Sequence, residues 1–343
     1  MDEAMQARKA EDASASAQLM QMIFGFMTSQ AISVAASLGI ADLMRDGAKS
    51  VDELALRSGA HAGALYRLMR ALASVGVFAE DGERRFCLTP LAEPLRSDAP
   101  DSLRAFSIFF GADFHLRVWG ELLYSVKHGQ PAFHHLHNSE VFEYLERNPV
   151  HAEVFNNGMT SLSASVADPI VSTYDFSGFR KLVDVGGGHG YLLAAVLKRY
   201  PGLTGLLYDT PLVLNGAGSV LRGVESRCEL VAGDFFDSVP PGGDAYMMKH
   251  IIHDWEDEKA IKILRNCHRV MDPEGRLLVI EMVVPEGNAP SPSKFLDLEM
   301  LLFLRSCERT EKQYRELFKK GGFELTRVVP TSTPYSIVEG VRI

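Results

Sequence analysis

Two histidines, His250 and His253, stand close together directly after a short apolar run. A histidine with an ordinary pKa of about 6.5 is largely neutral near neutral pH, so it can take a proton from an acidic hydroxyl group. We therefore predict that one of the two, His253 or His250, is a general base. Either histidine alone would more commonly cap the following helix or lie satisfied in the core.

A glycine-rich loop, Gly186–Gly190, follows another apolar run. Glycine is required where a Cβ would block the approach of a ligand to the backbone, or where the backbone needs a positive φ. In open α/β sheets the first strand-to-helix turn meets the ligand at the carboxyl ends of the strands. The loop, with Gly186 and Gly188, is therefore predicted to bind a nucleotide. A dinucleotide fingerprint starting at Gly186 would need a third glycine where Tyr191 stands, which weakens a dinucleotide interpretation without removing it.

Three aspartates, Asp184, Asp209 and Asp234, end consecutive predicted strands. A carboxylate at Asp209 can accept the protons of both ribose hydroxyl groups. Asp234 precedes Phe235, so its carboxylate is suited to an adenine amino group beside an aromatic face. Each acid alone is more commonly a turn residue or a helix cap. Three of them around one glycine loop favour an adenosine-containing cofactor.

The elements that position these residues begin near residue 176, where short apolar runs alternate with helical segments. This alternation predicts an α/β fold with a doubly wound, mostly parallel sheet. The last two runs are joined only by Thr331–Tyr335, too short for a crossover helix, so they should pair antiparallel. The predicted strands are Lys181–Val185, Gly205–Tyr208, Cys228–Val231, Ala245–Met248, Arg276–Met282, Glu324–Pro330 and Ser336–Arg342.

The N-terminal part predicts a different module. Apolar residues at spacings of three and four over Gln18–Arg45 predict a helix that breaks near Gly39. A capping-box pattern at Ser50 and Glu53, a helix over about 62–75 and a hairpin turn over 81–83 together predict a winged helix. Residues 51–98 contain six Arg and no Lys against seven Asp and Glu, a net charge of −1. This balance disfavours DNA binding and favours a packing or dimerisation module.

The stretch 101–171 is predicted to be helical and is rich in aromatic residues. Such helix surfaces are usually core, but part of this one could line a pocket for a flat ligand. We therefore divide the chain into three parts: 1–100, 101–175 and 176–343. His134, His135 and His137 lack a convincing fourth ligand, so we predict no metal site and expect a surface or pocket loop there.

The composition is that of a globular protein, with 46% apolar and 23% charged residues. The net charge of −9 disfavours nucleic acid as a partner and favours a small molecule. Four scattered cysteines without a C-x-x-C pair predict neither zinc nor disulfides. The N-terminus lacks the basic-then-apolar order of a secretory signal, and polar residues interrupt the apolar stretch 20–44. A cytoplasmic enzyme without a membrane span is expected.

Four motifs occur in order: D-V-G-G-G-x-G from Asp184, Gly233–Phe236, His253–Trp255 and Cys307–Thr310. Together with the segment 155–159 they resemble the hydroxyindole, caffeate and antibiotic O-methyltransferases, the family 2 small-molecule O-methyltransferases, over nearly the whole chain. The resemblance implies a Rossmann-like class I methyltransferase sheet of five parallel strands plus an antiparallel terminal pair, and an N-terminal winged-helix dimerisation domain. It also implies a homodimer and the cofactor S-adenosyl-L-methionine, which leaves as S-adenosyl-L-homocysteine.

The resemblance further implies roles for single residues. His253 would be the proton acceptor, with Glu308 and Glu281 flanking and orienting it. The implied cofactor-binding residues are Gly186, Gly188, Asp209, Asp234, Phe235 and Lys249, and the implied acceptor-pocket residues are Phe155, Met159 and Trp255. The expected acceptor is a hydroxyl group of a small phenolic or polyketide-like metabolite, and no metal is needed.

Other functions stay open at this point. Relatives with the same fold and cofactor methylate carbon or nitrogen, or act as decarboxylases or hydroxylases. A ligand-binding transcriptional regulator and a nicotinamide oxidoreductase are disfavoured by the acidic balance and by Tyr191. Plant relatives carry Gly-Gly-Lys before Glu-Arg-Thr, whereas this chain has Arg305-Ser306-Cys307, so the shape of their acceptor pocket cannot be transferred.

Overall fold

The computed structural model describes residues 15–343 of the chain. These residues form two compact units, one ending at Ala112 and the other beginning at Asp113. Each unit has a hydrophobic core of its own. The division of the chain into three parts, 1–100, 101–175 and 176–343, follows the function expected of each part. That division stays a prediction.

The first unit begins with a long helix, α2 (Ala15–Ser37), followed by the short helix α3 (Ile40–Leu43). The predicted break is confirmed, because Gly39 has a positive φ of 65° that ends α2. The capping box is also confirmed: Ser50 accepts a hydrogen bond from the Glu53 backbone, and Glu53 accepts one from the Ser50 backbone. The remaining helices of this unit are α4 (Val51–Ser58), α5 (Ala62–Ser74), η1 (Glu93–Leu95) and α6 (Arg104–Gly111).

A small antiparallel sheet in the order β1-β3-β2 completes the winged helix. The hairpin strands β2 (Phe78–Glu80) and β3 (Arg85–Leu88) lie where the sequence predicted them. Strand β1 (Lys49–Ser50) was not predicted, because two residues are too few for an alternating pattern to appear. The winged-helix prediction is therefore confirmed, with one additional strand.

Helix α2 exposes an unusual number of large apolar side chains. They are Leu19, Met20, Met22, Ile23, Phe24, Phe26 and Met27, each about half exposed or more. By length and composition α2 is the one helix among residues 15–343 that could cross a membrane, a test that helices of soluble proteins also pass. A contiguous exposed apolar surface of this kind commonly marks an interaction site.

The second unit opens with the aromatic-rich helices that the sequence predicted. They are α7 (Asp113–Gly120), α8 (Leu122–His128), α9 (Ala132–His137), α10 (Val141–Arg147) and α11 (Pro149–Thr173). The loop expected around His134, His135 and His137 is wrong, because all three lie on α9. Two of their rings pack on aromatic neighbours: His135 stacks on Tyr124 and His137 packs against Phe133.

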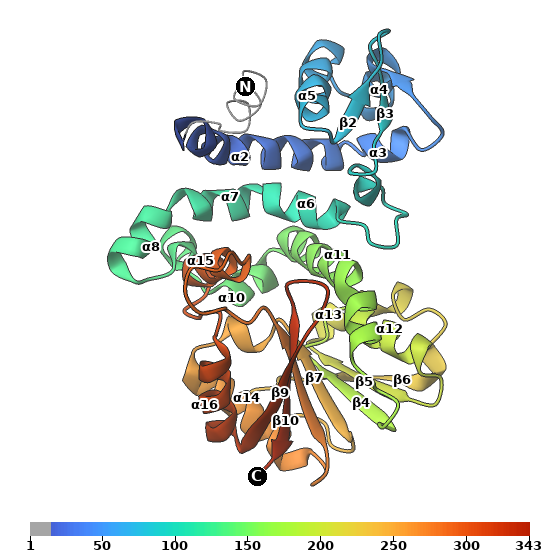
Figure 1. The fold of residues 1–343 in the computed structure, drawn as a ribbon. Helices are drawn as coiled ribbons and strands as arrows, with labels where there is room; N and C mark the ends of the chain where they lie inside the picture. Colours follow the sequence, from blue (N-terminus) through green and yellow to red (C-terminus); the bar gives the residue numbers. More distant parts are fainter. Residues whose placement is uncertain (1–14) are drawn as a thin grey trace, which may run out of the picture. The chain divides into compact units, whose positions relative to one another are not determined.

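The main sheet has the order β6-β5-β4-β7-β8-β10-β9 (Figure 1). Strands β4 to β8 are parallel, and β10 pairs antiparallel with both β8 and β9, as predicted. The strands are β4 (Lys181–Val185), β5 (Thr204–Asp209), β6 (Cys228–Ala232), β7 (Ala245–Lys249), β8 (Arg276–Glu281), β9 (Phe323–Pro330) and β10 (Ser336–Arg342). The chain reverses its direction of strand addition between β4 and β7, so the switch point lies at their carboxyl ends.

Helices cover both faces of this sheet, which explains the continuous apolar runs of its central strands (Figure 1). Alternate strand residues enter separate cores: Leu182 packs beneath α11 and α12, whereas Val183 packs beneath α14 and α16. The elements after β4 are α12 (Tyr191–Arg199), α13 (Pro211–Leu214), η2 (Ala217–Ser219), η3 (Glu225–Arg227), η4 (Ile252–Asp254), α14 (Asp257–Val270), α15 (Ser293–Phe303) and α16 (Glu311–Gly321). The sheet therefore presents a rigid edge at the carboxyl ends of its strands.

Candidate active site

The glycine loop lies at the switch point, between β4 and α12. Gly186, Gly188 and Gly190 have φ values of 68°, 62° and 80°, which side-chain-bearing residues rarely adopt. A Cβ added at Gly186 would lie 2.4 Å from a methyl carbon of Ile251 and 3.4 Å from the ring of Phe235. At Gly188 an added Cβ would meet nothing within 4 Å. The loop therefore needs its glycines for backbone shape, and Gly188 faces open space.

Asp209, at the end of β5, holds this loop. Its Oδ2 accepts a hydrogen bond of 2.8 Å from the Gly188 backbone, and its Oδ1 accepts one of 2.7 Å from the Thr210 backbone. Burial raises the pKa of Asp209, against the lowering effect of these two hydrogen bonds. Each oxygen of an ionised carboxylate has capacity for a further donor, so the group fits a pair of ribose hydroxyls.

Phe235 lies between the glycine loop and Trp255. Its ring centroid is 6.0 Å from that of Trp255, with the rings edge to face. The neighbouring Asp234 accepts a hydrogen bond of 2.7 Å from the Phe236 backbone, which shapes the turn. Asn266 on α14 donates from its amide nitrogen to the carbonyl oxygens of Phe235 (2.8 Å) and Phe236 (3.0 Å). Sequence reasoning missed Asn266, because its partners are backbone groups about thirty residues away.

Lys249, the last residue of β7, is half-buried near several acids. Burial lowers its pKa to about 8, while Glu281, Asp184 and Asp254 oppose that shift. Burial raises the pKa of Asp184 to about 7, with Lys249 opposing. Carboxylates thus outnumber cations beside the loop. This acidic balance favours a cationic ligand over a pyrophosphate, which disfavours a dinucleotide.

His253, on η4, is buried among three carboxylates. Its Nδ1 forms a hydrogen bond of 2.5 Å with Oε1 of Glu308 and lies 3.6 Å from Oε2 of Glu281. Its Nε2 lies 3.3 Å from Oδ1 of Asp254. The structure therefore brings the predicted flanking residues, Glu308 and Glu281, beside His253, and it adds Asp254, which the sequence had not assigned.

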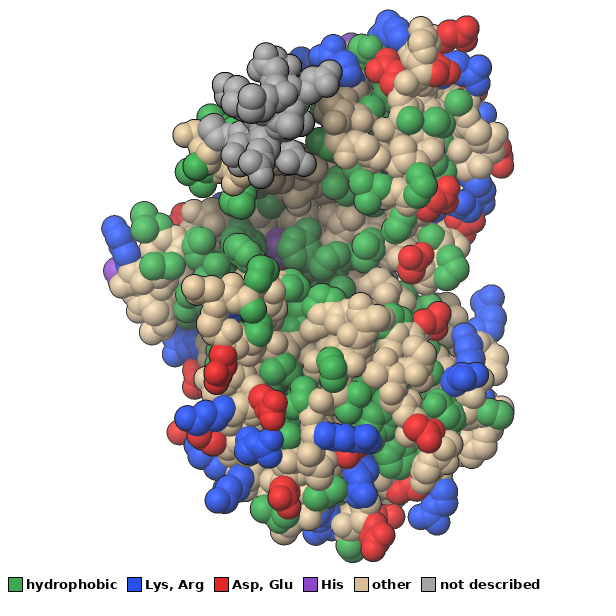
Figure 2. Space-filling view, viewed as in Figure 1, with side chains coloured by type: hydrophobic (Ala, Val, Ile, Leu, Met, Phe, Trp, Pro, Cys, Tyr) green, Lys and Arg blue, Asp and Glu red, His purple; other side chains and the backbone are tan. Residues whose placement is uncertain are grey.

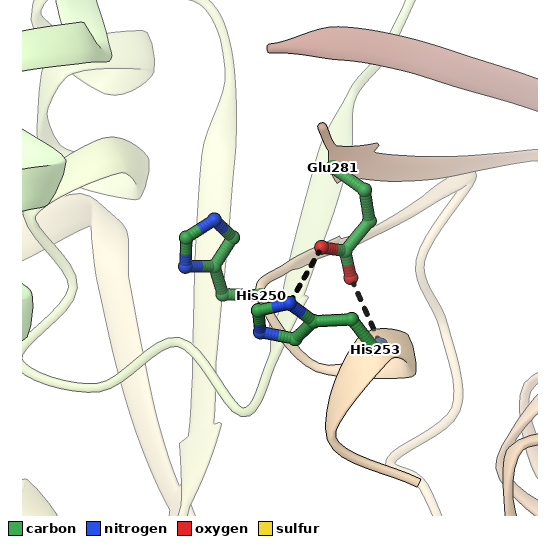
Figure 3. Close-up of side chains that lie close together, drawn as sticks. All are labelled: His250, His253 and Glu281. Atoms are coloured by element: carbon green, nitrogen blue, oxygen red, sulfur yellow. Dashed lines mark hydrogen bonds and ion pairs between the residues drawn. The ribbon is translucent and has the colours of Figure 1, made fainter. Parts of the chain in front are cut away.

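The Glu281 side chain at the end of β8 is completely buried and points at the turn that carries both histidines (Figure 3). Its Oε1 accepts from three successive backbone N–H groups, those of Ile251 (3.2 Å), Ile252 (3.1 Å) and His253 (3.3 Å). His250 starts this turn with a φ of 57°, a left-handed conformation that few residues other than glycine adopt. Three donors on one oxygen stabilise its negative charge in the interior.

The ionisation of His253 differs from the sequence expectation. Burial lowers its pKa, but the charges of Glu281, Glu308 and Asp254 and the hydrogen bond to Glu308 outweigh burial and raise the pKa to about 10. The expectation of an ordinary, largely neutral histidine is therefore wrong for this cluster, because three acids surround it. Burial also raises the pKa of Glu281, while the charge of His253 and the hydrogen bond from its backbone oppose that shift. Burial and the charges of Lys249 and His253 lower the pKa of His250 well below 6.5.

One ligand atom from each of His250, His253 and Glu281 lies within 4.8 Å of the others, which is close enough to consider a metal ion. The imidazole rings lie side by side, however, with centroids 4.4 Å apart and planes inclined by 38° (Figure 3). Nδ1 of His253 is already bonded to Glu308, and Oε1 of Glu281 already has three donors. We interpret the cluster as a proton site.

Arg309 joins the loop that carries Glu308 to the loop that carries His253. Its guanidinium is almost fully buried and donates to the carbonyl oxygens of Ile252 (3.0 Å) and Trp255 (2.8 Å). It also donates to Asp257 (2.9 Å). These carbonyls stand on either side of His253, so Arg309 fixes its position. The Arg of Glu-Arg-Thr was visible in the sequence, but nothing there indicated which carbonyls it reaches.

Two of the predicted acceptor residues, Phe155 on α11 and Trp255 directly after η4, join an aromatic group with Phe142 on α10. Phe142 stacks on Trp255 with centroids 5.5 Å apart and meets Phe155 edge to face at 6.4 Å. Met159 lies one turn after Phe155 on α11, so the two side chains share a helix face. The structure thus groups Trp255 and Phe155 through Phe142, a residue that sequence reasoning had not assigned to the site.

Comparison with known proteins agrees with this geometry. Residues 119–324 match the O-methyltransferase domain family, and residues 20–98 match the O-methyltransferase dimerisation domain family. A phenazine O-methyltransferase of Lysobacter antibioticus is 44% identical over 94% of this chain and 94% of its own length. A crystal structure of human N-acetylserotonin methyltransferase with bound S-adenosylmethionine has a TM-score of 0.90 at 25% identity, covering 96% of this chain and 98% of that one.

A third similar protein is an O-methyltransferase from neocarzinostatin biosynthesis, solved with S-adenosylmethionine and 2-hydroxy-5-methyl naphthoic acid. It is 32% identical, with a TM-score of 0.74, and the match covers 92% of this chain and 96% of that one. The chain belongs to the O-methyltransferase family with an N-terminal dimerisation domain. It is an S-adenosylmethionine-dependent O-methyltransferase with a class I methyltransferase sheet.

The contacts of Arg309 generate a stability prediction. In Arg309→Lys the shorter, single-headed ammonium cannot reach both carbonyls, and a buried carbonyl without a donor costs about 1–3 kcal/mol. We expect the free energy of unfolding in urea to fall by at least about 2 kcal/mol. The matched control is Arg305→Lys, at an exposed arginine of the same loop, which should leave unfolding unchanged. Equal stability of the two variants would contradict the role of Arg309.

Proposed function

We propose that the protein transfers a methyl group from S-adenosylmethionine to a hydroxyl group of a small, flat aromatic metabolite, with His253 as the proton acceptor. The observation that carries this proposal is the burial of His253 among Glu308, Glu281 and Asp254 beside the glycine loop. A surface histidine would not need three carboxylates, whereas a histidine that must hold a proton in the interior does.

The residues around the glycine loop fit the cofactor. Asp209 would accept the ribose hydroxyls, Asp234 the adenine amino group, and Phe235 would lie against the base. Gly186 and Gly188 let the backbone approach, and Lys249 stands among the acids beside them. When bound, S-adenosylmethionine supplies an electrophilic methyl group on a positively charged sulfur. The excess of buried carboxylates beside the loop favours that charge.

His253 would exchange a proton with the acceptor hydroxyl. A phenol has an ordinary pKa of about 10, and the carboxylates raise the pKa of His253 to about 10 as well. The raised pKa of His253 therefore favours transfer of the hydroxyl proton to the imidazole, which becomes an imidazolium held by the carboxylates. Glu308 fixes the ring orientation, and the three backbone donors hold Glu281 in place. Because orientation can contribute about 7–11 kcal/mol and general-base help about 3–5 kcal/mol, positioning should dominate the rate.

The acceptor would be aromatic. Phe142, Phe155 and Trp255 offer ring faces, and Met159 offers a polarisable side chain on the same helix. The relatives named above act on or bind phenazine and naphthoic acid compounds, which are flat and polycyclic. Both considerations support an acceptor of two or three fused rings that carries a hydroxyl group.

We also propose that the protein acts as a homodimer in the cytoplasm and needs neither metal nor nucleic acid. The match to a dimerisation domain covers most of α2, whose exposed apolar residues a second copy would bury. Acidic and basic side chains are interspersed over the second unit on the face shown in Figure 2, which suits a small-molecule enzyme better than a phosphate backbone. A monomer in light scattering at micromolar concentration would contradict the dimer.

The experiment that tests this function uses S-adenosylmethionine carrying a labelled methyl group, with a panel of hydroxylated phenazines, naphthoates, flavonoids and polyketides. We expect the label on a phenolic oxygen. We expect His253→Ala to lower kcat roughly 10²- to 10⁴-fold while leaving the affinity for S-adenosylhomocysteine near normal. Label on carbon or nitrogen would replace the proposed acceptor, and a His253→Ala variant with full activity would exclude the proposed base.

The pKa of His253 predicts a pH dependence. At pH 7 the imidazole carries a proton, so kcat/KM for the acceptor should rise with pH, up to tenfold per unit below the pKa. Glu308→Gln removes one negative charge, lowers the pKa of His253 and should move the rising limb to lower pH. Ionisation of the acceptor hydroxyl affects the wild type and Glu308→Gln equally, so it does not contribute to the difference between their pH profiles. Glu311→Gln, at an exposed ion pair with Arg315, is the control and should not move the limb. A limb unmoved in Glu308→Gln would contradict the assignment.

Asp209→Ala tests the cofactor site. The variant loses a carboxylate that holds the Gly188 backbone and would accept both ribose hydroxyls. Hydrogen bonds to a charged group contribute about 1.5–3 kcal/mol each, so we expect the dissociation constant of S-adenosylhomocysteine to rise at least about tenfold in calorimetry. Asp168→Ala, at an exposed acid of α11, serves as the control. Unchanged affinity in Asp209→Ala would remove Asp209 from the ribose site.

A further inference from the structure

His189 is the only residue of the glycine loop Gly186–Gly190 with a side chain. Its Nδ1 forms a hydrogen bond of 2.8 Å with the hydroxyl oxygen of Thr160, which lies on α11. The two residues are 29 positions apart in the sequence, so the bond ties together elements that the chain does not place side by side. Within residues 15–343, this bond is the one hydrogen bond that links a side chain of the glycine loop to the helices of the acceptor side.

The Nε2 side of the His189 ring, away from Thr160, also has a close neighbour. A Cβ added at Gly216 would lie 2.4 Å from Nε2 of His189, so the ring packs against the bare backbone of Gly216. Gly216 belongs to the segment that follows Asp209 and α13. The ring is therefore fixed between α11 and the segment after β5. It is half-buried, and burial lowers its pKa. Either tautomer can share one hydrogen bond with a hydroxyl group.

Helix α11 carries the residues proposed for the acceptor side. Met159 directly precedes Thr160, and Phe155 lies one turn earlier. Successive helix residues are rotated by about 100°, so Thr160 faces the glycine loop while Phe155 and Met159 share another face. The same helix also packs along α12, which starts at the end of the glycine loop. A shift of the loop at His189 is therefore transmitted to α11 directly at Thr160.

A loop made mainly of glycine has many accessible conformations, and ordering it opposes ligand binding. A single anchored side chain reduces that cost before the ligand arrives, and a ligand that orders the loop also orders whatever the anchor holds. We propose that the hydrogen bond between Thr160 and His189 couples the cofactor loop to α11, so that binding of the cofactor orders the helix that receives the methyl acceptor. Thr160 and His189 are then positioning residues, and this inference rests on the proposed function for its acceptor side.

The test follows backbone hydrogen exchange of the full-length protein with and without S-adenosylhomocysteine. In the wild type, we expect this ligand to slow exchange of the α11 amides around residues 156–164 by roughly two- to tenfold, the effect of one ordinary hydrogen bond. Thr160→Val keeps the shape of the side chain but removes the hydroxyl, so the slowing in α11 should be lost. Protection of the segment around Asp209 should persist. Thr160→Ser keeps the hydroxyl and should retain the wild-type response.

Ser163→Ala provides the matched control. It removes a hydroxyl of the same helix whose one hydrogen bond within residues 15–343 is to the Met159 carbonyl of α11. It should respond as the wild type does. Equal slowing of α11 exchange in the wild type and in Thr160→Val would overturn the coupling, as would an absence of slowing in the wild type. A wild-type protein that fails to bind S-adenosylhomocysteine would overturn the cofactor site itself, which is a different outcome. The readout needs no methyl acceptor, so an error in the proposed acceptor leaves this test intact.

Discussion

A carboxylate cannot stay ionised in a protein interior unless its charge is compensated, and Glu281 shows how much of this structure follows from that constraint. Its side chain is completely buried at the end of β8. Three consecutive backbone N–H groups donate to one oxygen of its carboxylate, and His250, with a positive φ, turns the chain directly before them. The same turn places His253 beside Glu281 and Glu308. The positive φ of His250, the cluster of His253 with its carboxylates and the end of β8 are therefore parts of one electrostatic arrangement.

The remainder of the site holds this arrangement in place. Arg309 bonds to the carbonyls on both sides of His253, and Asp297 on α15 accepts a hydrogen bond of 2.8 Å from the Glu308 backbone. Asn266 performs a similar task for the turn at Phe235. In each case a polar side chain satisfies backbone groups at the carboxyl edge of the sheet, where neighbouring strands end and cannot satisfy them. Chemistry at this edge depends on such tethers, because the loops themselves have no ladder of hydrogen bonds.

Sequence patterns predicted the parts of the molecule that depend on local periodicity. The strands agree with the structure to within about one residue at each end, and the break at Gly39 and the capping box at Ser50 also agree, because each has a short-range physical cause. Strand β1 was missed because it is too short for a pattern. The helix at His134 was taken for a loop because three histidines in four residues suggest a ligand site rather than a helix.

The ionisation of His253 was beyond sequence reasoning for a different reason. Its value depends on acids from separate elements, with Glu308 lying 55 residues away in the chain, and on the exclusion of water from the space between them. The bond between Thr160 and His189 and the contacts of Asn266 are equally non-local. Motifs can show which residues gather at a site, as they did for Glu308 and Glu281. The distances that set a pKa, and the backbone groups that a side chain satisfies, come only with the fold.

The cofactor loop and the acceptor-side helices differ in how many substitutions they can tolerate, and this difference has an evolutionary consequence. Gly186 has Ile251 and Phe235 against it, so almost any substitution there would displace the neighbouring chain. Arg305 is exposed, and the aromatic residues Phe142 and Phe155 lie on helices before β4 and not on the sheet. Selection can therefore reshape the half that meets the acceptor while the half that meets the cofactor stays fixed. A lineage built on this fold can diversify its products without redesigning its chemistry.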